Sequence, residues 1–301
     1  MQGLAFSDKE RDRLHLRGLL PPAILSLETQ MERVMINVRM KASDLERYSY
    51  LQSLQERNEY LFFKVVREHI SELLPLVHLP TVRKACRKYG LMFKSLPKSL
   101  FLTRQDAGSC WRVLKNWPER FIKVAMITDG EVVGPAGDLG VHAVNAVIAK
   151  LGLMTAIGGL NPSLMLPVQL DMGTNNEELL KSQFYSGLRH KRLTGEPADE
   201  LTNELITGIE ARFGKHVVLF FEDMKYGTAK TLLSQYGCAL APLLPCFADV
   251  PPAHRFIFLS GAQGFQEGVS ISGDNITGEP RAHHANVLGQ YSSPVCVYLL
   301  L

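Results

Sequence analysis

The sequence predicts an α/β fold in which a helical N-terminal region precedes a parallel β-sheet. Apolar residues recur at steps of three and four through roughly the first 90 residues, which is the spacing of amphipathic helices. Short β-branched and apolar runs follow, separated by segments long enough for the crossover helices that parallel strands require. The 301 residues are 46% hydrophobic and 21% charged, so a core is expected and extensive disorder is excluded.

Three helical segments are expected before the sheet. Residues 19–50 carry the first pattern, and its apolar face comprises Leu27, Met31, Val34, Met35 and Val38. Residues 58–74 carry the second, and Pro75 is expected to end it. Residues 80–89 form the third, with Gly90 as a C-terminal cap.

Three strands are expected in the middle of the chain, at residues 124–127, 166–170 and 217–221. Each is followed at once by acidic residues, namely Asp129, Asp171, and the pair Glu222 and Asp223. Ligands of open parallel sheets bind beyond the carboxyl ends of the strands, so these acids are candidates for one shared site. The competing interpretation of any single acid is that it caps the next helix or solvates a turn.

Charge and cysteine content exclude several classes of function. A formal charge of +3 without a basic run gives no indication of a nucleic-acid or membrane partner. The five cysteines contain no C-x-x-C pair, so neither a disulfide framework nor a zinc site is indicated. No apolar stretch long enough for a membrane span and no secretory signal occur, so a soluble intracellular protein is expected. The short segment Arg189-His-Lys-Arg192 is interpreted as a solvated basic patch.

The composition changes after Gly237. Residues 238–301 contain only six charged side chains, one strand-like run at 255–259, and Gly-rich and Ser-rich stretches. So short a segment cannot complete a doubly wound nucleotide-binding domain. We therefore expect one domain over residues 1–237 and a truncated second domain over residues 238–301.

Nine sequence strings, in order, resemble those of malic enzymes, and the resemblance covers residues 3–237. The strings are Gly18-Leu-Leu-Pro-Pro22, Gln55-Glu-Arg-Asn-Glu59, Leu79-Pro-Thr-Val82, Lys115-Asn-Trp-Pro-Glu119, Thr128-Asp-Gly-Glu131, Gly137-Asp-Leu-Gly140, Leu166-Pro-Val-Gln-Leu-Asp-Met-Gly-Thr-Asn-Asn176, Gly187-Leu-Arg-His-Lys-Arg192 and Phe221-Glu-Asp223. The resemblance implies oxidative decarboxylation of L-malate to pyruvate and CO2 with Mg²⁺ or Mn²⁺ and NAD or NADP. It also implies an N-terminal substrate and oligomerisation domain followed by a Rossmann-type NAD(P)-binding domain, here incomplete.

The resemblance also implies roles for individual residues. Lys150 corresponds to the catalytic base, Glu222 and Asp223 correspond to metal ligands, and His78 stands where the family has its proton-donating tyrosine. Burial near a metal favours the neutral amine that a base requires, and carboxylates are the ligands Mg²⁺ and Mn²⁺ prefer. No substrate-binding residue is assigned.

A weaker match concerns the dinucleotide. The segment His254 to Gly268 resembles the family's strand and phosphate loop, which implies cofactor contacts from Gly261, Ala262 and Gly268. Gln263 stands where the second glycine of the fingerprint is expected. NAD and NADP are not distinguished.

Two further departures from the family pattern affect the predicted site. Val132 replaces an arginine that would bind the malate carboxylate, so the guanidinium clamp is lost at that position. A later Asn-Asp-Asp-Ile-Gln-Gly string, which supplies a further metal carboxylate, is missing, because the chain passes from Gly237 directly to Cys238.

Three interpretations follow from these departures. The first is a malic enzyme acting on L-malate, as a homo-oligomer or with full-length subunits. The second is a non-catalytic paralogue or fragment that serves as a partner subunit. The third is that residues 238–301 come from a mis-spliced gene model. The expected compartment is the cytoplasm, with the mitochondrion as the alternative.

Overall fold

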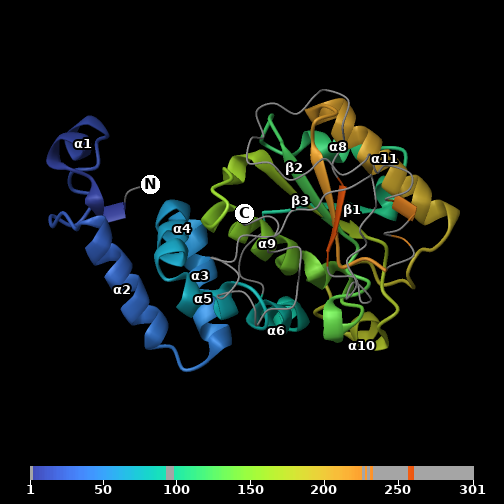
Figure 1. Ribbon diagram of the computed structural model, residues 1–301, viewed down its shortest axis with the longest axis horizontal. Helices are drawn as coiled ribbons and strands as arrows, with labels where there is room; N and C mark the ends of the chain where they lie inside the picture. Colours follow the sequence, from blue (N-terminus) through green and yellow to red (C-terminus); the bar gives the residue numbers. More distant parts are fainter. Residues whose placement is uncertain (1–2, 93–97, 226–227, 229–230, 233–256, 261–301) are drawn as a thin grey trace, which may run out of the picture.

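The computed structural model describes residues 3–92, 98–225, 228, 231–232 and 257–260. A group of N-terminal helices lies beside a five-stranded parallel sheet with strand order β1-β3-β2-β4-β5 (Figure 1). The strands are β1 Leu100–Thr103, β2 Val124–Thr128, β3 Met165–Asp171, β4 Val218–Glu222 and β5 Ile257–Ser260. The predicted α/β fold is confirmed, and the strand expected at 255–259 is found as β5, parallel to β4.

Along the chain, the α-helices fall into two groups, one before β1 and one after it. Those before it are α1 Asp8–Arg13, α2 Leu27–Arg39, α3 Asp44–Arg57, α4 Glu59–Glu68, α5 Ile70–Val77, α6 Thr81–Arg87 and α7 Tyr89–Met92. Those after it are α8 Cys110–Lys115, α9 Val144–Ala156, α10 Glu177–Lys181 and α11 Glu196–Phe213. Within the described parts of the chain, every helix is too short or too polar to span a bilayer.

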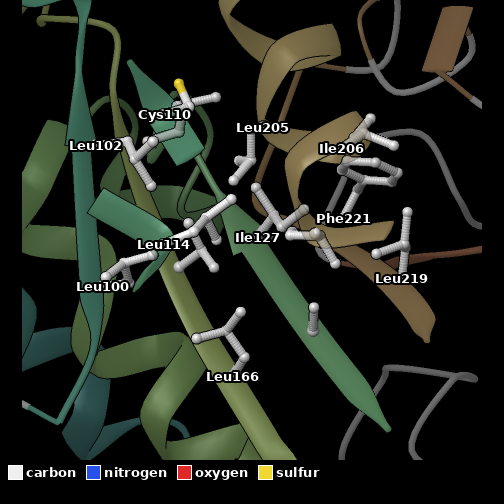
Figure 2. Close-up of a cluster of buried hydrophobic side chains, with 14 of the residues drawn as sticks. Leu100, Leu102, Cys110, Leu114, Ile127, Leu166, Leu205, Ile206, Leu219 and Phe221 are labelled. Carbon is white, nitrogen blue, oxygen red and sulfur yellow. The ribbon is translucent and has the colours of Figure 1, made fainter. Parts of the chain in front are cut away.

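The sheet is buried on both faces. Alternate residues of β2 show this, because Ala125 and Ile127 pack with α8 and α11, whereas Val124 and Met126 pack with α9. Figure 2 shows the first of these faces, where leucines of α8 and α11 meet strand residues such as Phe221. Burial of a large apolar side chain contributes about 1.5–3 kcal/mol, so these two layers hold the strand ends in place.

Helix α9 is the structural link between the sheet and the N-terminal helices. Its Val147 and Leu151 pack against strands, while Leu153 and Ala156 belong to the core formed by α2, α3, α4 and α5. Helices α4 and α6 both contact it. Residues on this helix are therefore held from two sides.

The N-terminal helices are shorter than the sequence patterns suggest. Instead of one helix over 19–50, α2 ends at Arg39 and α3 starts after Ser43, whose side chain accepts a hydrogen bond from the Glu46 backbone. The segment 58–74 is likewise two helices with a break at His69. The periodicity persists through both breaks because the successive helices contribute to one apolar core.

Two expected helix stops are wrong. Pro75 lies inside α5, where it removes one backbone donor only two residues before the helix ends. Gly90 lies inside α7 and does not cap α6, which ends at Arg87. A Cβ at Gly90 would lie 2.1 Å from the Phe184 carbonyl oxygen, so the glycine permits close packing.

Candidate functional site

Two side chains from different elements form a buried ion pair at the carboxyl end of β4. Lys150 projects from α9, and its Nζ contacts Oε1 of Glu222, the last residue of β4. The side chains are 14% and 1% exposed, respectively. Two of the residues that the resemblance singles out are thus in direct contact although 72 positions separate them.

The neighbouring carboxylate, that of Asp223, adds a second acid to this cluster without a second cation in contact with it in the described part of the chain. Asp223 is buried and has a positive φ of 53°, an uncommon conformation for a residue other than glycine. Burial and the Glu222 carboxylate raise the pKa of Asp223 well above its usual range, although Lys150 and Arg83 oppose the shift. Glu222 Oε2 is buried and has no hydrogen-bond partner among the described residues.

These carboxylates fit a divalent cation as a pair. Two adjacent buried acids and an unpartnered carboxylate oxygen provide the hard, negative ligands that Mg²⁺ and Mn²⁺ prefer. Among the described residues, however, no group of three or more His, Cys, Asp or Glu side chains is arranged to hold a metal. The expected protein ligands of a metal ion are therefore still the two carboxylates of Glu222 and Asp223.

A second charged cluster lies beside the first, at the end of β2. Arg192 Nη2 donates to Asp138 Oδ1 at 2.8 Å, and both Nη atoms donate to the Asp129 carbonyl oxygen. Its Nη1 also lies 3.5 Å from Asp129 Oδ2. Desolvation lowers the pKa of Arg192, but Asp129 and Asp138 outweigh it and the net shift is upward. The expectation of a solvated basic patch is wrong for Arg192, whose side chain is 2% exposed.

Asp129 differs from an ordinary surface aspartate in its pKa. Burial raises its pKa to about 6, and the Arg192 charge only partly opposes the shift. Its Oδ1 accepts a hydrogen bond from the Glu131 backbone at 3.0 Å. The residue therefore holds the turn after β2, and its charge also acts on Asp223 of the first cluster.

The third acidic strand end has a different role. Asp171 Oδ1 accepts from the Gly173 backbone at 3.0 Å, and Oδ2 accepts from the Leu188 backbone at 2.7 Å. Both oxygens are therefore used to order the segment after β3. The sequence-based suggestion that all three strand ends face one site stays a prediction. Asp171 fits the competing interpretation of a turn-stabilising acid.

His78 lies near the Lys150 cluster, at the C-terminal end of α5. Desolvation, and then the positive charges of Lys150 and Arg83, lower its pKa to about 4. The imidazole is therefore neutral at pH 7. A neutral ring can accept a proton at one nitrogen and donate from the other, but it is not the imidazolium acid that the sequence alone would suggest.

Arg83 is a basic residue of this site that the sequence analysis did not identify. It lies on α6, and its charge affects both His78 and Asp223. The sequence signal was weak, because an arginine in an amphipathic helix is ordinarily a solvated residue. Only the packing of α6 against α9, the helix that carries Lys150, brings Arg83 to this site.

Two sets of predicted features are not placed by the structure. Gly261, Ala262 and Gly268, the expected cofactor contacts, lie outside the described residues. So does the expected domain boundary at residues 237 and 238. Val132 is placed: its backbone N–H donates to the Asp223 carbonyl oxygen at 2.9 Å, which joins the loop after β2 to the end of β4.

Comparison with known proteins gives a consistent result. Residues 55–237 match the family model described as "Malic enzyme, N-terminal domain". The chain is 46% identical over 236 residues to the chloroplastic NADP-dependent malic enzyme of Oryza sativa subsp. japonica, covering 78% of this chain and 37% of that protein. It is 46% identical over 236 residues to NADP-dependent malic enzyme 1 of Arabidopsis thaliana, covering 78% of this chain and 40% of that protein.

A longer match extends beyond the family model. The chain is 45% identical over 300 residues to NADP-dependent malic enzyme 3 of Arabidopsis thaliana, which covers 93% of this chain and 51% of that protein. The chain thus spans between 37% and 51% of the length of these relatives.

Proposed function

Since the chain belongs to the malic enzyme family, we propose that it takes part in the oxidative decarboxylation of L-malate to pyruvate and CO2, with NADP as the cofactor. The names of its relatives support the choice of NADP. The observation that carries the proposal is the buried contact of Lys150 with Glu222, next to Asp223 and an unpartnered carboxylate oxygen.

In this proposal Glu222 and Asp223 hold a divalent cation. A bound Mg²⁺ or Mn²⁺ would draw electron density from the substrate oxygens and so favour both oxidation at C2 and loss of CO2. Two protein carboxylates leave further coordination positions for substrate and water.

Lys150 acts as the base at the C2 hydroxyl. Its side chain is mostly buried between α9 and β4, so it has little water to solvate a charge. Burial disfavours the charged ammonium relative to the neutral amine, which is the form that a base requires. Nζ is then the atom that accepts the hydroxyl proton.

His78 takes the position of the acid. Because its pKa is about 4, it is neutral at pH 7 and transfers a proton as a relay: one ring nitrogen donates while the other accepts. This differs from a phenol, which donates only from a single oxygen.

The test is malate-dependent reduction of the cofactor by the full 301-residue chain, with Mn²⁺ present and NADP and NAD assayed separately. We expect turnover with NADP that is lost in Lys150→Ala and kept in Lys215→Ala, an exposed lysine before β4. Loss of a catalytic base lowers the rate by roughly 10²- to 10⁴-fold. A folded wild-type chain without turnover would contradict the proposal that this chain is itself an active enzyme.

A second candidate function is that of a non-catalytic partner subunit that associates with full-length malic enzyme subunits. It is favoured by apolar residues that are exposed in the segment 19–40, including Leu19, Ile36 and Met40. Size-exclusion mass measured alone and with a full-length relative distinguishes the two functions. Co-elution without turnover supports the subunit role, and turnover by the isolated chain excludes a purely non-catalytic one.

A further inference from the structure

The Arg83 side chain reaches the loop that follows β2. A Cβ atom on Gly134 would lie 2.9 Å from Arg83 Nη2, so the guanidinium rests against this glycine. Gly134 has a φ of 49° and lies two residues after Val132, the position where the resemblance leads one to expect an arginine. The guanidinium of Arg83 thus enters from α6 the region that a side chain at 132 would serve.

The positive charge of Arg83 acts within the proposed active site. It contributes to the lowering of the His78 pKa, after burial and Lys150, and it opposes the rise in the Asp223 pKa. Arg83 is therefore close enough to both residues to influence a negatively charged molecule bound between them.

Arg83 differs from Lys150 and Arg192 in having no anionic partner among the described residues. Lys150 contacts Glu222, and Arg192 is held by Asp129 and Asp138. Within the described part of the chain, no carboxylate lies within ion-pair distance of Arg83, and its buried Nε has no hydrogen-bond partner. Buried donors almost always have a hydrogen-bond partner, so one without a partner calls for an explanation, such as a functional role or an ordered water.

We propose that Arg83 binds a carboxylate of the substrate, a 2-hydroxy dicarboxylic acid, in place of the arginine that Val132 replaces. A guanidinium presents two parallel N–H donors that match a carboxylate. With one end of the substrate at Glu222, Asp223 and Lys150, a cation on the far side of the site selects acids that carry a second carboxylate. This inference rests on the proposed function, because it assigns a residue to the same substrate.

The test is a calorimetric titration of the 301-residue chain with L-malate and with L-lactate, which lacks the second carboxylate, in the presence of Mg²⁺. Wild-type protein should bind malate more tightly than lactate, and Arg83→Ala should weaken malate binding roughly 10- to 100-fold. Lactate binding should change little, so the preference between the two acids disappears. Arg83→Lys, which keeps the charge without the fork, should retain part of the preference.

Arg87 provides the matched control. It lies one turn further along α6 and donates from Nη2 to the Pro135 carbonyl oxygen, so it contacts the same loop from an exposed position. Arg87→Ala should change malate affinity by less than about fivefold. In the Arg83→Ala background, Val132→Arg should restore malate binding, because it returns a guanidinium to the region that Arg83 serves.

The outcomes separate this inference from the proposed function. If the folded wild-type chain binds no malate, the proposed substrate and the role of Arg83 both fail. If the wild-type chain binds malate and Arg83→Ala binds it equally well, only the role of Arg83 is overturned. Near-UV circular dichroism of each variant establishes that the fold is intact, and Arg83→Lys provides the decisive comparison should Arg83→Ala unfold.

Discussion

Two buried charge clusters lie side by side at the carboxyl edge of the sheet, one centred on Arg192 and the other on the pair Lys150 and Glu222. In the first, the guanidinium contacts two acids and a carbonyl oxygen, and Asp138 also accepts backbone hydrogen bonds from Gly140 and Asn175. In the second, Lys150 contacts Glu222 next to the Asp223 carboxylate, and one oxygen of Glu222 has no hydrogen-bond partner among the described residues.

The difference indicates which cluster maintains the fold and which is available for chemistry. A buried polar network whose groups all have partners rigidifies the structure, whereas an unpaired buried group costs stability unless a ligand satisfies it. The Arg192 cluster holds the loop from Asp129 to Gly140 in place. The Lys150 cluster retains an unpartnered carboxylate oxygen at the position where the proposed cation would bind.

The largest expected effect comes from removing the centre of the satisfied cluster. Arg192→Ala leaves Asp129 and Asp138 without their cation, and breaking a buried ion pair in this way typically costs about 3–5 kcal/mol. Urea unfolding followed by circular dichroism measures the change. Arg189→Ala, an exposed arginine of the same segment, should alter the free energy of unfolding by less than about 0.5 kcal/mol. A loss below about 1 kcal/mol for Arg192→Ala would show that the network is not structural.

The next test is the loss of stability in acid that a buried histidine, His142, is expected to cause. His142 Nδ1 has no partner among the described residues, and the ring packs against Tyr89 and Tyr185. Burial lowers its pKa to about 4, below the unfolded value near 6.5, so the unfolded chain binds the proton more tightly. This contribution is complete above pH 6.5 and is lost as the pH falls to 4, on the order of 3 kcal/mol.

The pH dependence is checked by comparing variants over that range. Unfolding free energies of wild type and His142→Gln should converge or cross as the pH falls from 6.5 to 4, whereas the exposed control His216→Gln should run parallel to wild type. Taking differences removes the contributions of other groups, including Asp129 and His78. Parallel curves for wild type and His142→Gln would contradict the assignment of a buried neutral imidazole.

The smallest expected effect on stability comes from the incomplete cluster. Glu222→Gln removes the ion pair with Lys150 but also the repulsion from Asp223, so the free energy of unfolding should change by less than about 1 kcal/mol. Asp138→Asn, its counterpart in the satisfied cluster, should cost roughly 2 kcal/mol through lost charged hydrogen bonds. Glu222→Gln should abolish malate-dependent turnover although the protein stays folded. Any loss of turnover in Asp138→Asn should be no larger than its loss of stability explains. Equal stability losses in the two variants would remove the distinction between the clusters.

Much of the fold was accessible from local patterns. The three central strands were predicted within two residues of their observed bounds because strands buried on both faces appear as short continuous apolar runs. Strand β1 was missed, since four residues, Leu100–Thr103, form too short a run to stand out from a loop. Helix breaks at Met40 and His69 were missed because the apolar spacing continues across them.

The candidate site was predictable in part. Resemblance to malic enzymes indicated Lys150, Glu222, Asp223 and His78, but their roles remain predictions. Composition and spacing alone indicated only the acids at the strand ends. Arg83 gave only a weak local signal, because its significance depends on its distance from other groups.

The sequence by itself determined the α/β class, the order of its main elements and the presence of acids after the strands, because each follows from short-range patterns of burial and backbone propensity. Only the tertiary structure decided which charges meet. Arg192 and Asp129 are 63 positions apart, and Lys150 and Glu222 are 72 positions apart. Such pairings depend on how α9 packs between the sheet and the N-terminal helices, and on which charges are cut off from water. No local pattern carries that information, because the energy of a buried charge is set by all of its neighbours together.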